Sequence, residues 1–557
     1  MKFLDLSRYL TGTLLVLLFV ALWCIMPATA WCADGDQPVK AAVSPVPPMS
    51  QDRQASSATV KDEAAAPVSE DTEEDLLQVT PPDPDAMKAT DEAIRFYKGQ
   101  EVEQDYKQAA ELFEKGAKKG GSVAAYSLGY MYQHGQGVAQ DARRALKWYG
   151  ESAEADDVLA QYRYADMVYH GVGIKADHVL AGKWYLKAAA NPDAQPVNQY
   201  AAGAFYESGD GVEKDLAKAA KWYEKSADGG YGLASHCLGY FYFTGTGVVK
   251  DEAKAIPLFK QAADQGFPQS GFSLAMMYYN GSGGLKRDFN EAAERFIPLA
   301  EEEGFAPAQY ALAVMLEKGE GMGADPDAAL TWYQKAHDSG YAPATYRVAM
   351  MYLMGSFGKK KDQSAAFKLC TIAAQKEYAP AQCALGVMYE KGVGVSVDYA
   401  KAMDWYKKSA AGGNTEGLVR LAVMYDNGIG VGRDMKKAAA LYEKAAIRED
   451  RFACYRLGGM YYRGLGVSRD FSLAAKWFEV AARQGDVAAQ YNLAVLYHNG
   501  EGVKKDDVAA YAWMMLTATQ GKRVAAHQRD IIRTGMSDDQ VRAATELFNK
   551  LYKIVML

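Results

Sequence analysis

The sequence predicts an all-α protein, an α/α solenoid in which helix-turn-helix units wind into a right-handed superhelix. Three observations predict this fold: a pattern that returns about every 36 residues, a pair of glycines in each copy, and an aspartate shortly after them. A chain of 557 residues could hold several ordinary domains. A fixed period of this size instead indicates one repeat array.

Most copies contain a turn of the form G-x-G-V or a near variant, as in Gly392 to Val395. Glycines at such positions adopt the left-handed conformations that end a helix and reverse the chain, and the valine covers the turn. The first glycines of these turns are Gly135, Gly171, Gly209, Gly245, Gly281, Gly319, Gly355, Gly392, Gly428, Gly464 and Gly500.

An aspartate follows the second glycine in every copy. At the start of a second helix, an aspartate accepts hydrogen bonds from unpaired backbone N–H groups and suits the positive end of the helix dipole. We therefore expect helix caps rather than catalytic carboxylates. These residues are Asp141, Asp177, Asp215, Asp251, Asp288, Asp325, Asp362, Asp398, Asp434, Asp470 and Asp506.

Two positions of the second helix follow each aspartate at fixed spacing. Four residues on stands an alanine, from Ala145 to Ala510, where close helix packing is expected. Three residues further is a bulky position, which holds every tryptophan after Trp31. A ligand site would not need one tryptophan per repeat, so we expect packing wedges between repeats. They are Trp148, Trp184, Trp222, Trp332, Trp405, Trp477 and Trp513.

The first helix of each unit follows A-x-x-x-[LVYA]-[GA]-x-x-Y, as in Ala381 to Tyr389. Apolar residues at i, i+4, i+5 and i+8 form one buried helical stripe. A methionine often precedes the closing aromatic, and its phase favours a core role as gap filler. These methionines are Met131, Met167, Met277, Met315, Met351, Met388, Met424 and Met460.

This pattern resembles the Sel-one-like repeat (SLR) family, which is related to tetratricopeptide repeats. Residues 378–413 match its motif nearly throughout. We count eleven copies over residues 121–521 and a degenerate copy over 89–120, which has Glu101 in place of the second glycine. Residues 522–557 are expected to form capping helices, starting near Ser537 to Gln540, because end units must cover the last apolar face.

The N-terminus predicts export. Lys2 and Arg8 precede the apolar run Leu14 to Met26, and Ala28 to Ala30 forms an A-x-A cleavage site. The run is shorter than the roughly 20 residues of a membrane span, so cleavage near Ala30 is preferred over a retained anchor. Residues 31–88, rich in Pro, Ala and acidic residues, predict a disordered linker. We expect a periplasmic or secreted protein that contacts the membrane only transiently, through its export signal.

Exported proteins can form disulfides, but the cysteines of this chain are sparse. Cys24 and Cys32 each follow a tryptophan, which argues against lipid attachment. Cys237, Cys370, Cys383 and Cys454 are expected to be mostly small buried residues. A pairing of Cys370 with Cys383 stays open.

Solenoids bind proteins along a concave surface, and the family resemblance implies a scaffold or adaptor, for exported members in the cell envelope. The candidate surface combines a tyrosine column, which we place well away from the buried stripe, with an adjacent arginine column. Such a composition is typical of binding hot spots and can also stack on sugars, so binding of glycan or peptidoglycan is the alternative. The predicted residues are Tyr126, Tyr162, Arg163, Tyr200, Phe272, Tyr310, Tyr346, Arg347, Arg420, Tyr455, Arg456 and Tyr491.

An enzyme is the competing class, and the sequence gives it little support. The seven histidines are scattered, and we find no zinc-protease, nucleophile-elbow or phosphate-loop motif. We predict no catalytic residue, no metal site and no cofactor. A beta-lactamase-like activity, which the resemblance suggests for cysteine-rich members, is disfavoured because this chain lacks their paired cysteines. A net charge of -7 gives no reason to expect nucleic acid.

Overall fold

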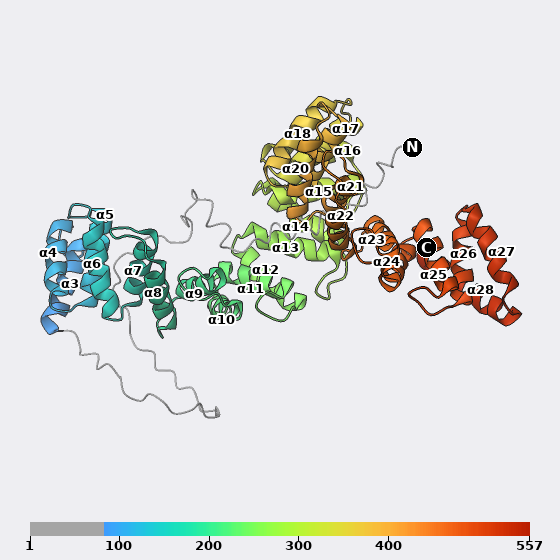
Figure 1. Cartoon of the computed structure of the whole chain (residues 1–557). Coiled ribbons are helices and arrows are strands. Elements are labelled where there is room, and N and C mark those ends of the chain that lie inside the picture. Colours follow the sequence, from blue (N-terminus) through green and yellow to red (C-terminus); the bar gives the residue numbers. More distant parts are fainter. Residues whose placement is uncertain (1–82, 557) are drawn as a thin grey trace, which may run out of the picture. The chain divides into compact units, whose positions relative to one another are not determined.

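The computed structural model describes residues 83–556, which contain 26 α-helices and no strand. The chain divides into two compact units between Glu303 and Gly304. Figure 1 shows that each unit is a row of paired helices. The predicted all-α solenoid is confirmed. The predicted export signal and nearly all of the predicted linker lie outside the described residues.

The helices of the two units follow one another in antiparallel pairs, a first and a second helix per repeat. Unit 1 contains α3 (Pro84–Lys98), α4 (Tyr106–Ala117), α5 (Ser122–His134), α6 (Ala142–Glu154), α7 (Val158–His170), α8 (His178–Ala190), α9 (Pro196–Ser208), α10 (Leu216–Asp228), α11 (Gly232–Thr244), α12 (Glu252–Asp264), α13 (Pro268–Asn280) and α14 (Phe289–Glu301). Unit 2 contains α15 (Ala306–Lys318), α16 (Pro326–Asp338), α17 (Ala342–Met354), α18 (Gln363–Gln375), α19 (Ala379–Lys391), α20 (Tyr399–Ala411), α21 (Thr415–Asn427), α22 (Met435–Ala446), α23 (Arg451–Arg463), α24 (Phe471–Arg483), α25 (Val487–Asn499), α26 (Asp507–Thr519), α27 (Arg523–Thr534) and α28 (Asp538–Met556).

Within a unit, each second helix packs on the first helix of its own repeat and on the first helix of the next. Thus α20 packs on α19 and on α21. Neighbouring first helices also touch, as α19 touches α21. A first helix therefore has neighbours on several sides, which leaves only part of its surface exposed.

The predicted turns and caps are confirmed. Each aspartate of the row is the N-cap of a second helix; Asp141, for example, accepts hydrogen bonds from the backbone N–H groups of Arg143 and Arg144 at 3.0 and 3.1 Å. The second turn glycine has a further role. Gly173 has φ 79°, and a Cβ there would lie 2.6 Å from the carbonyl oxygen of Ala142 in the preceding repeat. The turn thus presses against the start of the previous second helix.

The alanine and methionine columns are buried as predicted, but the tryptophan column is not the main packing element. Only Trp148 and Trp513 are buried, and the other five are half-buried. The residue after each tryptophan is buried more deeply than the tryptophan, such as Tyr149 after Trp148. It stands four residues after the buried alanine, so the two share a stripe, whereas the tryptophan lies at its edge. The column includes Tyr149, Tyr185, Tyr223, Phe259, Phe296, Tyr333, Tyr406, Tyr442 and Phe478.

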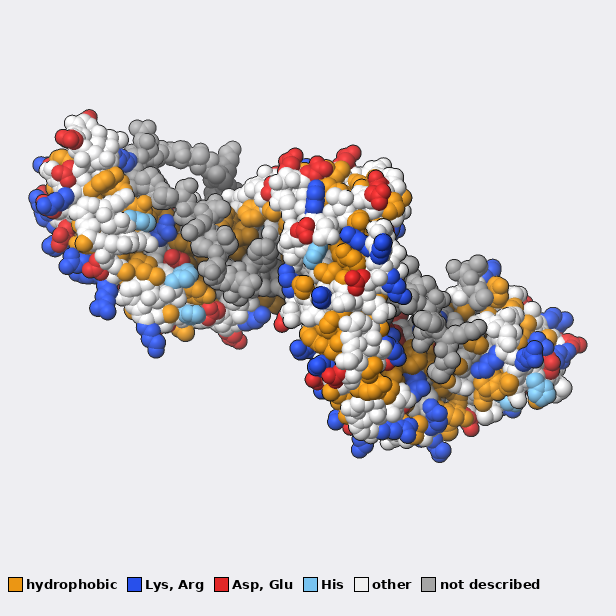
Figure 2. All heavy atoms as spheres, turned by 90° about the horizontal axis from the view of Figure 1, so that it is seen from above, with side chains coloured by type: hydrophobic (Ala, Val, Ile, Leu, Met, Phe, Trp, Pro, Cys, Tyr) orange, Lys and Arg blue, Asp and Glu red, His pale blue; other side chains and the backbone are white. Residues whose placement is uncertain are grey.

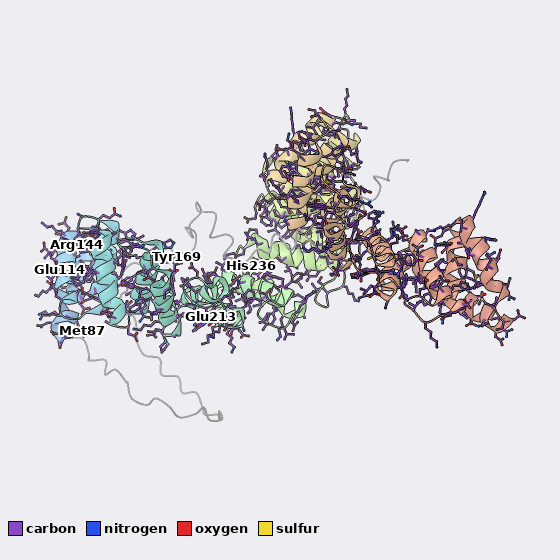
Figure 3. The ribbon with its side chains drawn as sticks, viewed as in Figure 1. Met87, Glu114, Arg144, Tyr169, Glu213 and His236 are labelled. Atoms are coloured by element: carbon purple, nitrogen blue, oxygen red, sulfur yellow. The ribbon has the colours of Figure 1, made fainter. Side chains whose placement is uncertain are left out.

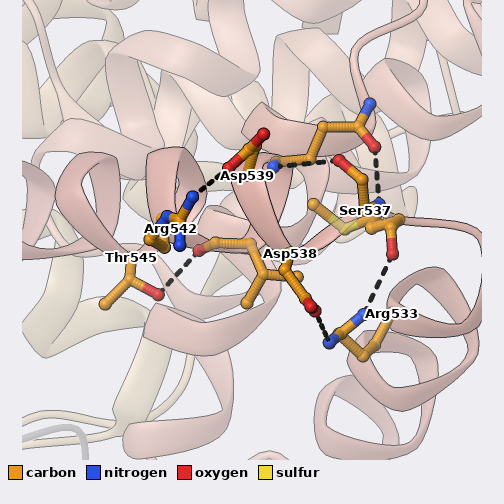
Figure 4. A network of polar contacts seen from close by, with 9 residues as sticks. Arg533, Ser537, Asp538, Asp539, Arg542 and Thr545 are labelled. Atoms are coloured by element: carbon orange, nitrogen blue, oxygen red, sulfur yellow. Dashed lines mark hydrogen bonds and ion pairs between the residues drawn. The ribbon is translucent and has the colours of Figure 1, made fainter.

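At the C-terminal end, α28 packs on α26 and α24 and covers the last repeat. Ser537 and Gln540 form the predicted cap: the Ser537 N–H donates to the Gln540 side chain at 2.8 Å, and the Gln540 N–H donates to the Ser537 hydroxyl at 3.3 Å. Figure 4 shows this cap beside the Arg533–Asp538 ion pair, which ties α27 to the start of α28.

Candidate interaction surface

The predicted tyrosine column lies closer to the core than the sequence indicated. Tyr126, Phe272 and Tyr310 are buried, so their placement away from the buried stripe is wrong. Rings of this column contact the buried aromatic of the second helix in the same repeat. The Tyr126 and Tyr149 centroids are 5.5 Å apart, and the Tyr310 and Tyr333 centroids are 5.4 Å apart.

The remaining members of the column are half-buried: Tyr162, Tyr200, Tyr346, Tyr455 and Tyr491. The reason is the packing of the first helices between neighbouring second helices. In α15, every residue from Ala308 to Met315 is buried. A helical wheel treats the helix as having one buried face, whereas a helix inside the stack has several. The role of the half-buried tyrosines in partner binding stays a prediction.

The predicted arginine column makes contacts between repeats. Arg347 of α17 forms an ion pair with Glu317 of α15, and the two side chains are 13% and 17% exposed. Arg456 of α23 pairs in the same way with Asp426 of α21. These two arginines therefore join successive first helices, in addition to any role at a binding surface.

The other two arginines occupy the same position with different partners. Arg420 of α21 donates to Glu416 at 2.7 Å, and its charge also acts on Glu390 of the preceding repeat. Arg163 of α7 lies near the Tyr126 hydroxyl of the preceding repeat, and its charge offsets part of the rise that burial causes in the pKa of Tyr126. The arginine column as a whole thus faces the previous repeat.

A buried tyrosine hydroxyl completes these contacts. Tyr333 donates to Glu317 at 2.7 Å, and Tyr442 donates to Asp426 at 3.2 Å. We call this arrangement a junction: an acid two residues before the turn glycine, a second-helix tyrosine 16 residues after the acid, and an arginine 30 residues after the acid. The sequence contained a signal for the junction, because in three repeats the acid is followed 30 residues later by an arginine. These pairs are Glu317 and Arg347, Glu390 and Arg420, and Asp426 and Arg456.

One junction has the acid and the tyrosine but no arginine. Glu207 of α9 is 6% exposed and accepts a hydrogen bond from Tyr223 at 2.5 Å, while the arginine position is Cys237 of α11. Burial raises the pKa of Glu207, and the hydrogen bond from Tyr223 offsets part of that effect. At Glu390 burial also acts to raise the pKa, but hydrogen bonds from Lys391 and Tyr406 outweigh it, so the pKa lies below its usual value.

The outer face of the second helices carries cations over aromatic rings. Arg144 of α6 lies 5.5 Å from the ring centroid of Tyr132 and also pairs with the capping Asp141, and its position is marked in Figure 3. Lys335 lies 3.9 Å from the Trp332 ring. Basic and acidic side chains are interspersed on the face shown in Figure 2, so this surface does not form a broad patch of one charge.

The described cysteines are buried, and His236 is half-buried. Cys237, Cys370, Cys383 and Cys454 are buried thiols outside any disulfide, so Cys370 and Cys383 do not pair in this structure. Burial raises the pKa of Cys370 to about 12, which disfavours the reactive thiolate. Burial lowers the pKa of His236 to about 4. Within residues 83–556, no group of three or more His, Cys, Asp and Glu side chains is arranged to hold a metal ion.

No helix among the described residues has both the length and the apolar character that crossing a bilayer requires.

A family model for the Sel1 repeat matches most of the chain. The matched segments are 93–121, 122–157, 158–193, 199–231, 234–267, 271–294, 306–341, 342–378, 379–414, 415–450, 451–486 and 487–522.

Curated relatives resemble a limited part of the chain. Chitin synthase regulatory factor 3 of Schizosaccharomyces pombe is 34% identical over 120 residues, which cover 21% of this chain and 13% of that protein. Chitin synthase regulator SKT5 of Malassezia restricta is 29% identical over 135 residues, which cover 24% of this chain and 9% of that protein. The chain thus spans about a tenth of the length of these relatives.

Two solved structures are similar over more of the chain. A protective antigen of uropathogenic Escherichia coli strains that displays an SLR fold is 29% identical, with a TM-score of 0.46, and the alignment covers 80% of this chain and 94% of that one. A Sel1 repeat protein from Oxalobacter formigenes is 30% identical, with a TM-score of 0.46, and the alignment covers 63% and 96%.

Proposed function

Because this chain belongs to the Sel1 repeat family, whose helical solenoids fit protein-interaction roles, we propose that it is a non-enzymatic scaffold that binds a protein partner in the cell envelope or outside the cell. The observation that carries the proposal is the contrast between residues that repeat regularly and residues that vary. Turn glycines, capping aspartates and buried aromatics repeat regularly, while the exposed side chains of the first helices change from repeat to repeat. A variable surface on a regular framework suits recognition of a specific partner.

The helix α23 presents the best test surface. Phe452 and Tyr462, near the two ends of the helix, are 44% and 37% exposed, and the predicted residue Tyr455 is half-buried. Exposed aromatic side chains contribute strongly to protein interfaces because they bury a large area at low entropic cost. The curated relatives are named as regulators of chitin synthase, and a role in controlling another protein agrees with this proposal.

Crosslinking and pull-down from envelope extracts with the full chain test the proposal. We expect a defined protein partner whose recovery falls at least about tenfold for Phe452→Ser combined with Tyr462→Ser, the loss of about 1.4 kcal/mol of binding free energy. Val249→Ser is the matched control, because Val249 is 88% exposed in a turn of another repeat. Recovery of the same proteins with the wild type and the α23 variant would contradict the role of this surface.

Two further measurements address the finer parts of the proposal. Cleavage of the export signal predicts a mature chain that begins at Trp31, which N-terminal sequencing of the protein from its native compartment checks; a chain that retains Met1 contradicts it. A tryptophan-fluorescence titration with cell-wall glycan fragments tests the glycan alternative. A saturable change would favour glycan binding, and a flat response would remove it.

A further inference from the structure

The junction at Glu207 differs from the other junctions that contain an acid. In those, the next first helix supplies an arginine to the acid: Arg347 for Glu317, Arg420 for Glu390 and Arg456 for Asp426. At Glu207 the corresponding residue is Cys237, which brings no positive charge. Among the described residues, Lys214 acts on Glu207 through its charge without forming an ion pair. The carboxylate is buried and its cation position is not filled by the next helix.

The filled junctions show which group this position accepts. The guanidinium carbon of Arg347 lies 5.8 Å from the ring centroid of Tyr333, and that of Arg456 lies 5.9 Å from the centroid of Tyr442. Each guanidinium therefore contacts both a carboxylate and the ring of the second-helix tyrosine. At Glu207 the equivalent ring is that of Tyr223, which is completely buried and already donates its hydroxyl to the carboxylate.

The cation position lies on the solvent side of the acid. The Asp426 side chain is 5% exposed, yet Arg456, which covers it, retains 32% exposure. Glu207 is buried to a similar extent, at 6%. Glu207 reaches this burial without an arginine over it, so a cation that approaches from the solvent side must displace the side chains that now cover the carboxylate.

Half-buried tyrosines surround the position. The Tyr200 ring centroid is 5.6 Å from that of Tyr223 and 5.3 Å from that of Tyr231. Tyr240 is close enough for Glu207 to affect its pKa, which burial raises first and the carboxylate raises further. Aromatic faces next to a carboxylate favour a flat cation, because the ring quadrupole attracts positive charge.

We propose that the Glu207 junction binds the side chain of an arginine from a partner protein, in the place that Arg347 and Arg456 occupy in their own junctions. The inference rests on the proposed scaffold function and adds a specific contact to it. Arginine is favoured over lysine because a planar guanidinium pairs with a carboxylate and stacks on a ring at once. The cations paired with Glu317 and Asp426 are both arginines. Glu390 pairs with Lys391 of its own helix at 2.7 Å, and Arg420 of the next first helix acts on it through its charge.

The experiment uses the full chain with two small probes, N-acetyl-arginine methylamide and its citrulline analogue, which has the same shape without the charge. Thermal unfolding is followed at fixed ionic strength while each probe is titrated. We expect a saturable rise of the melting temperature with the arginine probe only. A dissociation constant on the order of 1 mM is expected for a ligand of about 16 heavy atoms.

Two variants at the junction test the assignment. Glu207→Gln keeps the acceptor for Tyr223 but removes the charge, and it should abolish the difference between the two probes. Cys237→Arg should place a guanidinium in the position permanently and also abolish the response. Equal responses of the wild type to the two probes, or an unchanged response in Glu207→Gln, would overturn the inference.

Arg347→Cys provides the matched control, since it gives Glu317 the same neighbour that Glu207 has. This variant should respond to the arginine probe at a second site, and that added response should disappear in the Glu317→Gln, Arg347→Cys double variant. A response of Arg347→Cys without any response of the wild type would show that the Glu207 position is closed, which also overturns the inference.

The same variants separate this inference from the scaffold proposal. In one outcome, a partner is recovered equally with the wild type and Glu207→Gln, and the probes do not change the melting temperature. This outcome would contradict the arginine site and leave the scaffold function intact. In the other outcome, the arginine probe raises the melting temperature but no partner is captured. This outcome would contradict the scaffold function and leave the arginine site intact.

Discussion

The Asp426 and Glu207 junctions occupy the same place in their repeats and share a buried carboxylate and a tyrosine donor. Asp426 has a third member, Arg456, whereas Glu207 has Cys237 at that position. A buried carboxylate loses its hydration, and a paired guanidinium compensates for that loss. The comparison teaches that one repeat framework can either neutralise its own charge or keep a carboxylate for an external cation.

Removing an arginine from a filled junction gives the largest expected effect. Arg347→Met keeps an unbranched apolar stem but leaves Glu317 buried without its cation, and we expect a loss of about 3 kcal/mol in the stability of the cooperative unit. Urea unfolding measures it. Arg542→Met is the control, because the Arg542–Asp539 pair is 75% and 82% exposed and should contribute little. Equal losses in the two variants would contradict the structural role of the junction.

Removing the tyrosine hydroxyl should separate the two kinds of junction. Tyr223→Phe takes away a hydrogen bond to a carboxylate that has no paired arginine, so we expect a cost of about 2 kcal/mol. Tyr442→Phe should cost less, about 1 kcal/mol, because Arg456 still binds Asp426. The shift of the urea midpoint in each variant checks the order. A larger shift for Tyr442→Phe would break the comparison.

Supplying the missing arginine should stabilise the chain. In Cys237→Arg, the new guanidinium can pair with Glu207 and lie over Tyr223, and we expect a gain of about 1 kcal/mol, seen as a higher melting temperature. Cys237→Met adds bulk without charge and serves as the control. A gain in both variants would point to filled space rather than to the ion pair.

The pH dependence of stability should have opposite signs at Glu207 and Glu390. The folded pKa of Glu207 is raised, so its contribution is largest at low pH and falls as the pH rises from the unfolded value through the folded one. The folded pKa of Glu390 is lowered, so its contribution is present above the unfolded pKa and is lost as the pH falls through the folded value. The groups that act on Glu207 are Tyr223, Tyr240 and Lys214.

Melting temperatures of the wild type, Glu207→Gln and Glu390→Gln between about pH 4 and 7 measure this small effect. Relative to Glu207→Gln, the wild type should lose stability as the pH rises. Relative to Glu390→Gln, it should gain stability. The same sign for both variants would contradict the assigned environments.

Features that depend on one turn or one helix were predictable from the sequence. A capping aspartate acts on the N–H groups two and three residues ahead, so its role at Asp141 follows from spacing alone. The main packing role was assigned to the tryptophan column, one position before the residue that is most buried. The alanine four residues before Tyr149 already indicated the correct position, because residues four apart share a helix face. Helical periodicity on the second helix, applied from that alanine, identifies the buried ring.

Features that cross from one repeat to the next were not predictable from one helix. The tyrosines at 126 and 310 were placed on an open face because the covering helices belong to neighbouring elements. Arg347 and Arg456 were taken only as binding residues, because their acids lie 30 residues earlier in the chain. Contacts of this kind are determined by how successive repeats align with each other, and the spacing of residues within one helix does not reveal them.

The junctions also limit how this array can change by gain or loss of whole modules. Deletion of residues 415–450 would leave Glu390 followed by Arg456, so the boundary would keep an acid and an arginine. Deletion of residues 342–378 would leave Glu317 followed by Ala384, and the acid would lose its cation. The module 415–450 carries both an arginine suited to its predecessor and an acid suited to its successor, whereas 342–378 carries only the arginine and 379–414 only the acid. Recombination between modules of similar sequence would therefore succeed at some boundaries and fail at others.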